Sequence, residues 1–236
     1  MPRSALAEVH ADAEAVRSRA HVGVLVPWAN TMIETELPRV GLEPLVFHYA
    51  RIVPARRYRE SDAFLQQLTA GVPTALAQFE RLGLAGVLLG CTTIGFTYPA
   101  APGTAALVGA FEALLAGLRR LEAARVVLAT PYPTGWTDRE VAAFTAHGVD
   151  VAASMCLDWD VLRDYTAITT SDIHGLVDRL PAAARADAAA LVLSCTAWPT
   201  LAALPELEAR LGIPVLSSNL ALAWQAVRIA LAAESA

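Results

Sequence analysis

GVLLGCTT at Gly86–Thr93 and ALVLSCT at Ala190–Thr196 are near copies of one another, and their cysteines lie 104 positions apart. Each segment is a short apolar run that predicts a buried strand, and each ends on a cysteine followed by threonine. A strand that places a thiol at its carboxyl end, found twice, indicates two similar α/β halves that face one site. The third cysteine, Cys156, has no such context, and we interpret it as structural.

Predicted strands and helices alternate along the whole chain. Apolar β-branched runs predict strands at 21–26, 45–53, 85–90, 125–130, 149–153, 189–194 and 213–216. Helical spacing of apolar residues predicts helices at 61–82, with Ser61 as its cap, and at 104–122, 136–147, 171–186, 204–211 and 221–233, after a short leading helix within 1–20. This alternation predicts an α/β fold with parallel sheets, whose sites form outside the carboxyl ends of the strands.

Composition limits the class of protein. The 236 residues are 55% hydrophobic and 17% charged, which is typical of a packed globular chain. We expect no transmembrane segment and no signal peptide, and three cysteines indicate reduced thiols and a cytoplasmic location. All 18 cationic residues are arginine, which excludes Schiff-base chemistry and a P-loop lysine. The net charge of −5 argues against a nucleic-acid partner, and we expect no membrane partner either.

One basic cluster stands out, formed by Arg51, Arg56, Arg57 and Arg59. It is either a solvated loop or an electrostatic funnel for a small anionic molecule.

The two strand-end cysteines are the candidate catalytic residues. A thiol between a strand end and a helix start gains from backbone N–H groups and the helix dipole, which favour the thiolate. The hydroxyls of Thr92, Thr93 and Thr196 could hold an anion near the sulfur. One such cysteine alone would more often be a small buried hydrophobe, but two in matched positions favour function.

Other strand ends carry further candidates. Asn30 and Thr31 follow the first predicted strand, where Asn30 is either a helix N-cap or a substrate-binding amide. Tyr132 follows the strand at 125–130, and Asn219 follows the last strand in the run Ser217-Ser218-Asn219. We find no metal-ligand spacing, no glycine-rich phosphate fingerprint and no G-x-S-x-G elbow, so no metal and no cofactor are expected.

These residues together resemble a known family. VPWANTMIE at Val26–Glu34, CTT at Cys91, ATPY ending at Tyr132, LSCT at Cys195 and GIPVLSSNLALAW at Gly212–Trp224 resemble, in order, the motifs of maleate cis-trans isomerases. That family lies within the aspartate/glutamate racemase superfamily, which includes arylmalonate decarboxylases. The resemblance covers most of the chain from His21 to about Ala230.

The resemblance implies two pseudo-symmetric α/β halves with the active site between them. We expect residues 1–103 plus 217–236 to form the first half, closed by the C-terminal helix, and residues 104–216 to form the second. It also implies that Cys91 is the nucleophile and Cys195 the acid/base, with Asn30 and Tyr132 contacting a small dicarboxylate. Thr31, Thr92, Thr93, Thr196 and Asn219 complete the predicted substrate site.

The chain departs from the family pattern at three places. No asparagine occurs at 158–165, where Asp158, Asp160 and Arg163 lie instead. Cys91 and Tyr132 lie only 41 positions apart, so we expect the first half to lack a helix and its fourth strand. Trp28 also stands where the opening motif of the family has a small residue.

Three functions are compatible with the residues. The first is cis-trans isomerisation of a maleate-type dicarboxylate through addition of Cys91. The second is a cofactor-independent racemase that uses both thiols, with an arylmalonate-type decarboxylase that uses only the second cysteine as its variant. The third is a non-catalytic protein that binds small molecules. A homodimer is a family-level expectation only.

Overall fold

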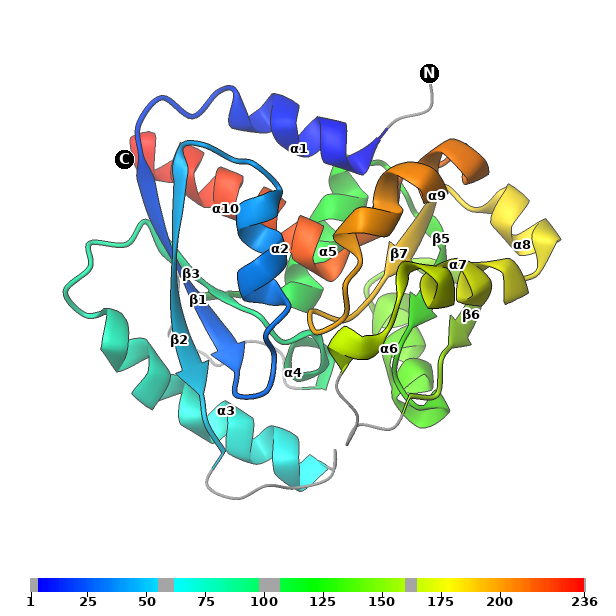
Figure 1. Cartoon of the computed structure of the whole chain (residues 1–236), viewed down its shortest axis with the longest axis horizontal. Coiled ribbons are helices and arrows are strands. Elements are labelled where there is room, and N and C mark those ends of the chain that lie inside the picture. The colour runs from blue at the N-terminus through cyan, green and yellow to red at the C-terminus, as the bar shows by residue number, and fades with distance from the viewer. Residues whose placement is uncertain (1–3, 55–61, 98–106, 160–164, 236) are drawn as a thin grey trace.

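The computed structural model describes residues 4–54, 62–97, 107–159 and 165–235, and its strands form two parallel sheets (Figure 1). The first sheet has the order β2-β1-β3-β4 and the second the order β6-β5-β7-β8. The strands of the first sheet are β1 (Ala20–Pro27), β2 (Leu45–Ile52), β3 (Gly86–Leu89) and β4 (Leu107–Gly109). Those of the second sheet are β5 (Arg125–Thr130), β6 (Asp150–Cys156), β7 (Ala190–Leu193) and β8 (Val215–Ser217).

The two sheets have the same internal order, so the prediction of two similar α/β halves is confirmed. β3 pairs with β1 as β7 pairs with β5, and each pairing ends at a leucine, Leu89 or Leu193. In each half a single residue lies between this leucine and the following cysteine, Cys91 or Cys195. The repeat in the sequence is therefore a repeat of structure, and both cysteines follow a central strand of their sheet.

Helices connect the strands and cover the sheets. The α-helices are α1 (Ala5–Ala13), α2 (Ile33–Arg39), α3 (Asp62–Leu76), α4 (Thr92–Thr97), α5 (Ala110–Arg120), α6 (Thr134–Ala146), α7 (Thr170–Arg179), α8 (Ala182–Asp187), α9 (Leu204–Leu211) and α10 (Ser218–Glu234). Short 3-10 turns are η1 (Ala77–Phe79), η2 (Tyr165–Ala167) and η3 (Leu201–Ala203). Among the described residues, none of these helices is long and apolar enough to cross a membrane.

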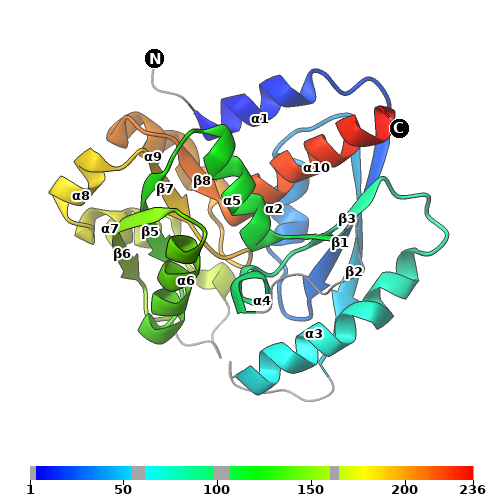
Figure 2. The ribbon, with the colours of Figure 1, turned by 180° about the vertical axis from the view of Figure 1, so that it is seen from behind.

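α5 and α10 lie side by side between the two sheets (Figures 1 and 2). α10 also contacts α1, β1 and β3. A Cβ at Gly117 of α5 would come within 2.8 Å of the Leu216 side chain, so a glycine here lets α5 lie directly against β8. The two helices thereby join the halves through one continuous buried core.

The expectation that the first half lacks its fourth strand is wrong. Leu107–Gly109, predicted as part of a helix over 104–122, pairs with β3 as β4, and the helix begins only at Ala110. Leu107 and Val108 are branched apolar residues that suit a strand. Their pairing with β3 outweighs the helical spacing of the surrounding sequence. β4 lies within 104–216, the predicted second half, yet it pairs with β3 and so belongs to the sheet of the first half. The rest of the predicted division into halves stays a prediction.

Two other predicted helices differ in extent. The helix predicted over 171–186 is broken at Pro181, which ends α7 and precedes α8, since proline cannot donate an intrahelical hydrogen bond. α7 is capped by Thr169 and Asp172 in a capping box. The helix predicted over 61–82 ends as η1 at Phe79, and its predicted cap, Ser61, lies outside the described residues.

Candidate active site

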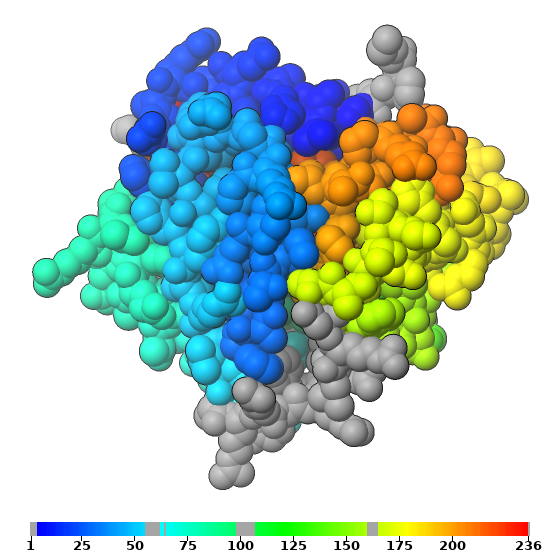
Figure 3. All heavy atoms as spheres, viewed as in Figure 1, coloured from blue at the N-terminus to red at the C-terminus, as the bar shows by residue number. Residues whose placement is uncertain are grey.

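Both strand-end cysteines are buried where the halves meet. Cys91 follows β3 and directly precedes α4, and 7% of its surface is exposed. Cys195 follows β7 and is 5% exposed. Figure 3 shows the halves in close contact on one face, with the blue α2 surface against the orange surface of η3 and α9. The thiols are therefore shielded from bulk water.

Ser218, at the start of α10, joins the surroundings of the two cysteines. Its Oγ accepts a hydrogen bond from the backbone N–H of Cys195 at 3.0 Å. The same oxygen accepts one from Thr92 Oγ1 at 3.1 Å. Thr92 is adjacent to Cys91, so one fully buried hydroxyl holds the strand ends of both halves together.

A second connection runs from Thr196 to the first half. Thr196 Oγ1 donates to the carbonyl of Gly90 at 2.8 Å and accepts from Asn30 Nδ2 at 2.9 Å. Gly90 precedes Cys91, and a Cβ there would lie 2.5 Å from Ile33 Cδ1 and 3.1 Å from the carbonyl of Leu25. The glycine is therefore needed for the close approach that sets the position of Cys91.

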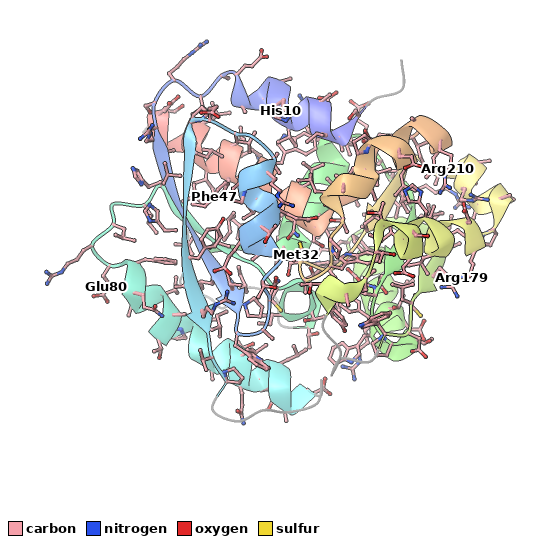
Figure 4. All side chains as sticks on the ribbon, in the orientation of Figure 1. His10, Met32, Phe47, Glu80, Arg179 and Arg210 are labelled. Atoms are coloured by element: carbon pink, nitrogen blue, oxygen red, sulfur yellow. The ribbon has the colours of Figure 1, made fainter. Side chains whose placement is uncertain are left out.

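Asn30 is both an N-terminal cap and a contact between the halves. Its Oδ1 accepts hydrogen bonds from the backbone N–H groups of Met32 and Ile33 at the start of α2, at 3.0 and 3.2 Å. Met32 is labelled at this turn in Figure 4. The Asn30 side chain thus caps α2 through its oxygen and contacts Thr196 of the second half through its nitrogen.

Arg51, the first residue of the basic cluster, holds the loop that carries Asn30. Its guanidinium donates to the carbonyls of Asn30, at 2.8 Å, and Trp28, at 3.3 Å, and forms an ion pair with Glu34. The other three members, Arg56, Arg57 and Arg59, lie outside the described residues. Arg51 is thus committed to protein contacts, and the funnel interpretation stays a prediction.

The two thiols have different surroundings. Cys91 Sγ lies 3.3 Å from Thr93 Oγ1 and directly before the first turn of α4, as expected of a thiol between a strand and a helix. In the described chain the next α-helix after Cys195 begins at Leu204, as predicted, so this thiol, unlike Cys91, does not directly precede a helix N-terminus. Cys195 instead has φ of 144°, a strained value for a residue with a side chain, and its Sγ accepts from the Ala197 N–H at 3.3 Å.

Tyr132 lies next to the second thiol. It is 2% exposed, and its hydroxyl is hydrogen-bonded to Cys195. Burial, together with the charges of Cys195, Glu140 and Cys91, raises the pKa of the Tyr132 phenol well above its ordinary value. The phenol therefore stays protonated and acts as a donor to sulfur.

Asn219 links Glu36 to the segment that follows Cys195. Its Nδ2 donates to Glu36 Oε2 at 2.8 Å and to the Thr196 carbonyl at 3.2 Å. Glu36 also accepts from the Leu201 N–H, at 2.6 Å, and from Thr200 Oγ1. Burial raises the pKa of the Glu36 carboxyl despite these hydrogen bonds. Both amide hydrogens of Asn219 are thus used by the protein, and its role in substrate binding stays a prediction.

The remaining predicted residues are placed as follows. Thr92, Thr93 and Thr196 are buried within this cluster. Thr31 is exposed, and its carbonyl accepts a hydrogen bond from Thr35 Oγ1, so its predicted substrate contact is not tested by these contacts. Cys156 is half-buried at the end of β6, where its sulfur lies 3.5 Å from Thr134 Oγ1.

Sequence reasoning missed three residues of this region. Ser218 was noted only as part of a strand-end run, and Glu36 and Glu140 were not singled out. Both glutamates lie on the buried face of their helix, Glu36 beside Ile33 and Leu37, and Glu140 between Thr137 and Phe144. A carboxyl at such a position is the signal that could have found them. In the described chain, no three His, Cys, Asp or Glu side chains converge to hold a metal ion.

Two similar parallel-sheet halves with a strand-end thiol from each define the aspartate/glutamate racemase-like class of enzymes. The family model for arylmalonate decarboxylase matches residues 104–236. The arylmalonate decarboxylase of Bordetella bronchiseptica is 36% identical over 230 residues, covering 89% of this chain and 90% of that protein. The chain belongs to the arylmalonate decarboxylase family, and it is an enzyme.

Maleate isomerases are also among its relatives, which confirms the resemblance drawn from the motifs. The maleate isomerase of Nocardia farcinica is 29% identical over 233 residues, covering 88% of each protein. A solved structure of the maleate cis-trans isomerase from this organism, a cysteine-to-serine mutant with a covalently bound succinylcysteine intermediate, superimposes with a TM-score of 0.79. It is 24% identical and covers 89% of this chain and 92% of that one.

Proposed function

We propose that this enzyme is a cofactor-independent cis-trans isomerase that converts a small cis-unsaturated dicarboxylate of the maleate type into its trans isomer. The observation that carries the proposal is the pair of buried thiols, Cys91 and Cys195, which have different partners. Ser218 links their segments by hydrogen bonds to the Cys195 backbone N–H and to Thr92. A site with a nucleophile from one half and a separate acid/base from the other suits addition and elimination at a double bond.

In the first step Cys91, as thiolate, adds to one alkene carbon and forms a C–S bond. The electron pair of the double bond moves to the other alkene carbon, where the adjacent carboxylate delocalises it. The Cys195 thiol then gives its proton to that carbon, which produces a succinyl adduct on Cys91. Tyr132, hydrogen-bonded to Cys195, stabilises the thiolate that remains.

In the second step the former double bond is single, so it rotates freely. Cys195 removes a proton from the carbon it protonated, the double bond forms again, and the C–S bond breaks to release Cys91 thiolate and the trans product. Both protein residues return to their starting states. The succinylcysteine intermediate named for the Nocardia farcinica isomerase supports this route by analogy.

The buried polar groups around the thiols are the candidates for holding the two carboxylates. Thr93 Oγ1 lies beside Cys91, and Asn30 carries one amide hydrogen beyond the one given to Thr196. Such fixed donors stabilise the negative charge that develops on the substrate during addition.

Decarboxylation of an arylmalonate-type diacid is the second candidate. It is favoured by the higher identity, 36%, to the arylmalonate decarboxylase of Bordetella bronchiseptica. That reaction would use Cys195 as proton donor and make no demand on Cys91, so Cys91→Ala separates the two candidates. A two-thiol racemase would need both cysteines and would exchange an α-proton without net change of substrate.

The test is proton NMR of the purified enzyme with maleate in D₂O under reducing conditions. We expect fumarate to appear with the unmodified enzyme and with Cys156→Ala, whose thiol lies outside the site, and no fumarate with Cys91→Ala. Intact-mass measurement of Cys195→Ala with maleate should show an adduct of one substrate, and Cys91→Ser should show none.

If maleate stays unchanged, the isomerase proposal fails for this substrate. Substituted malonates and amino acids in the same solvent then decide between the alternatives. Loss of carboxylate that survives in Cys91→Ala identifies the decarboxylase, and deuterium at an α-carbon without other change identifies the racemase.

A further inference from the structure

Glu140 is a carboxyl group without solvent exposure that lies beside the candidate active site and has no part in the mechanism above. It is on the buried face of α6, with Thr137 and Phe144. Its Oε1 accepts a hydrogen bond from Ser194 Oγ, and Ser194 directly precedes Cys195. Its Oε2 is also buried and has no hydrogen-bond partner among the residues that the structure describes. A purely structural carboxyl in an apolar core would normally have both oxygens satisfied.

The charges near Glu140 belong to the active site. Its carboxylate acts on the Tyr132 phenol, which in turn is hydrogen-bonded to Cys195. Burial raises the pKa of Glu140 to about 8, and the Ser194 hydrogen bond opposes this rise. Ser194, Cys195, Tyr132 and Glu140 thus form one buried chain of polar groups.

Other elements packed on α6 bring few titratable groups to this region. β6 carries Asp150, which is exposed and ion-paired with Arg125, and the half-buried Cys156. α4 carries no titratable side chain. α5, whose Phe111 packs on Phe144, carries Glu112, and burial raises the pKa of that carboxyl while the nearby His147 partly opposes the rise.

We propose that Glu140 is a positioning residue that acts through Ser194 and Tyr132: its neutral carboxyl lets Cys195 carry the one negative charge of this buried chain. This inference rests on the acid/base role proposed for Cys195. Two negative charges in one buried group of side chains repel each other, so ionisation of Glu140 opposes formation of the Cys195 thiolate. Above the pH at which Glu140 loses its proton, formation of the Cys195 thiolate during turnover is therefore opposed.

Infrared spectroscopy of the free enzyme tests the inference without any substrate. A protonated buried carboxyl has its own C=O stretching band, and Glu140→Gln identifies which band belongs to Glu140. We expect the band to be present at neutral pH and to disappear with a midpoint of about 8. Cys195→Ser, which removes a thiol whose ionisation competes with that of Glu140, should lower that midpoint, whereas Ser194→Ala should raise it because a hydrogen bond to the carboxylate is lost.

Controls separate Glu140 from the other buried acids. Cys156→Ser should leave the midpoint unchanged, and Glu112→Gln should leave the Glu140 band in place. If Glu140→Gln does not fold, the responses to Cys195→Ser and Ser194→Ala still identify the band. In the described chain Glu36 is instead hydrogen-bonded to Asn219 and Leu201, and Glu112 lies near His147. An ionised Glu140 at neutral pH, or a midpoint unaffected by Cys195→Ser, overturns the inference.

The pH profile of kcat/KM is the second readout, for whichever substrate the enzyme converts. We expect Glu140→Gln to retain activity at neutral pH and to lose the decline near pH 8 that the carboxyl causes. A role in packing alone would lower activity by one factor at every pH. Because the infrared measurement needs no turnover, failure of maleate as substrate and failure of this inference are distinguishable.

Discussion

Asn30 of the first half and Thr196 of the second are joined by a hydrogen bond of 2.9 Å from Nδ2 to Oγ1. Asn30 also begins α2, and Thr196 also holds the carbonyl of Gly90. The contact therefore sets the positions of the segments on either side of the two cysteines. Rigid placement of this kind is what covalent catalysis between two halves requires.

Thr196→Val should destabilise the enzyme and lower its activity. Valine has the shape of threonine but leaves Asn30 Nδ2 and the Gly90 carbonyl without a partner, which costs about 2 kcal/mol of unfolding free energy. Chemical denaturation measures this change. Thr35→Val is the matched control, because Thr35 bonds to an exposed carbonyl and its loss should change stability by less than about 0.5 kcal/mol.

Ser218→Ala should reduce turnover more than Ser217→Ala does. The first change removes the acceptor shared by the Cys195 N–H and Thr92, and leaves a buried N–H unsatisfied at a cost of about 1–3 kcal/mol. Ser217 is the N-cap of α10, so its loss costs about 1 kcal/mol of stability and leaves the thiols in place. Paired measurements of thermal unfolding and kcat check both variants. Equal loss of kcat in the two would contradict the role given to Ser218.

Gly90→Ala should displace Cys91. The added Cβ would lie 2.5 Å from Ile33 Cδ1 and 3.1 Å from the Leu25 carbonyl, so backbone or side chains must shift, at about 1–3 kcal/mol. The rate at which iodoacetamide labels Cys91 reports the displacement. Gly175→Ala is the control: nothing lies within 4 Å of its Cβ, and in the interior of α7 it should stabilise the fold by about 0.5–1 kcal/mol. An unchanged labelling rate in Gly90→Ala would argue against a tight fit.

Stability should fall as pH rises from about 4.5 to about 8 because of Glu140. The folded state raises the pKa of this carboxyl above that of the unfolded chain, so the folded protein binds the extra proton across this window and loses stability as the pH increases. The loss is on the order of 3 kcal/mol between pH 5 and pH 8. Glu140→Gln removes this slope, which urea denaturation at several pH values measures. A slope that remains in Glu140→Gln would assign it to other carboxyls.

Much of the architecture was predictable from local pattern. The segments at Arg125–Thr130 and Leu204–Leu211 form the strand and helix that periodicity predicts, with the same bounds. Short elements were harder, because α2 and α4 have too few residues for a helical period to stand out. β4 was missed for a related reason: three residues beside a helix carry almost no signal of their own, and their pairing with β3 makes them a strand.

The candidate site was likewise predictable only where it depends on local sequence pattern. A cysteine directly after a strand is visible in sequence, since the carboxyl ends of parallel strands form sites. The helix predicted after Cys195 is present at Leu204–Leu211, but it does not begin at the thiol, and the backbone at the cysteine has φ of 144°. The contact of Glu140 with Ser194 was not predictable from local pattern, because the two residues lie 54 positions apart.

The sequence by itself determined the two α/β halves, the strand-end cysteines and the family, because these depend on local periodicity and on motifs in a given order. Only the tertiary structure decided which side chains join the halves: Ser218 to Cys195 and Thr92, Asn30 to Thr196, and Glu140 to Ser194. These contacts link residues far apart in the chain, and burial gives them their energy by removing water as a competing partner. Local sequence pattern shows neither which distant residues come together nor whether their contact is buried.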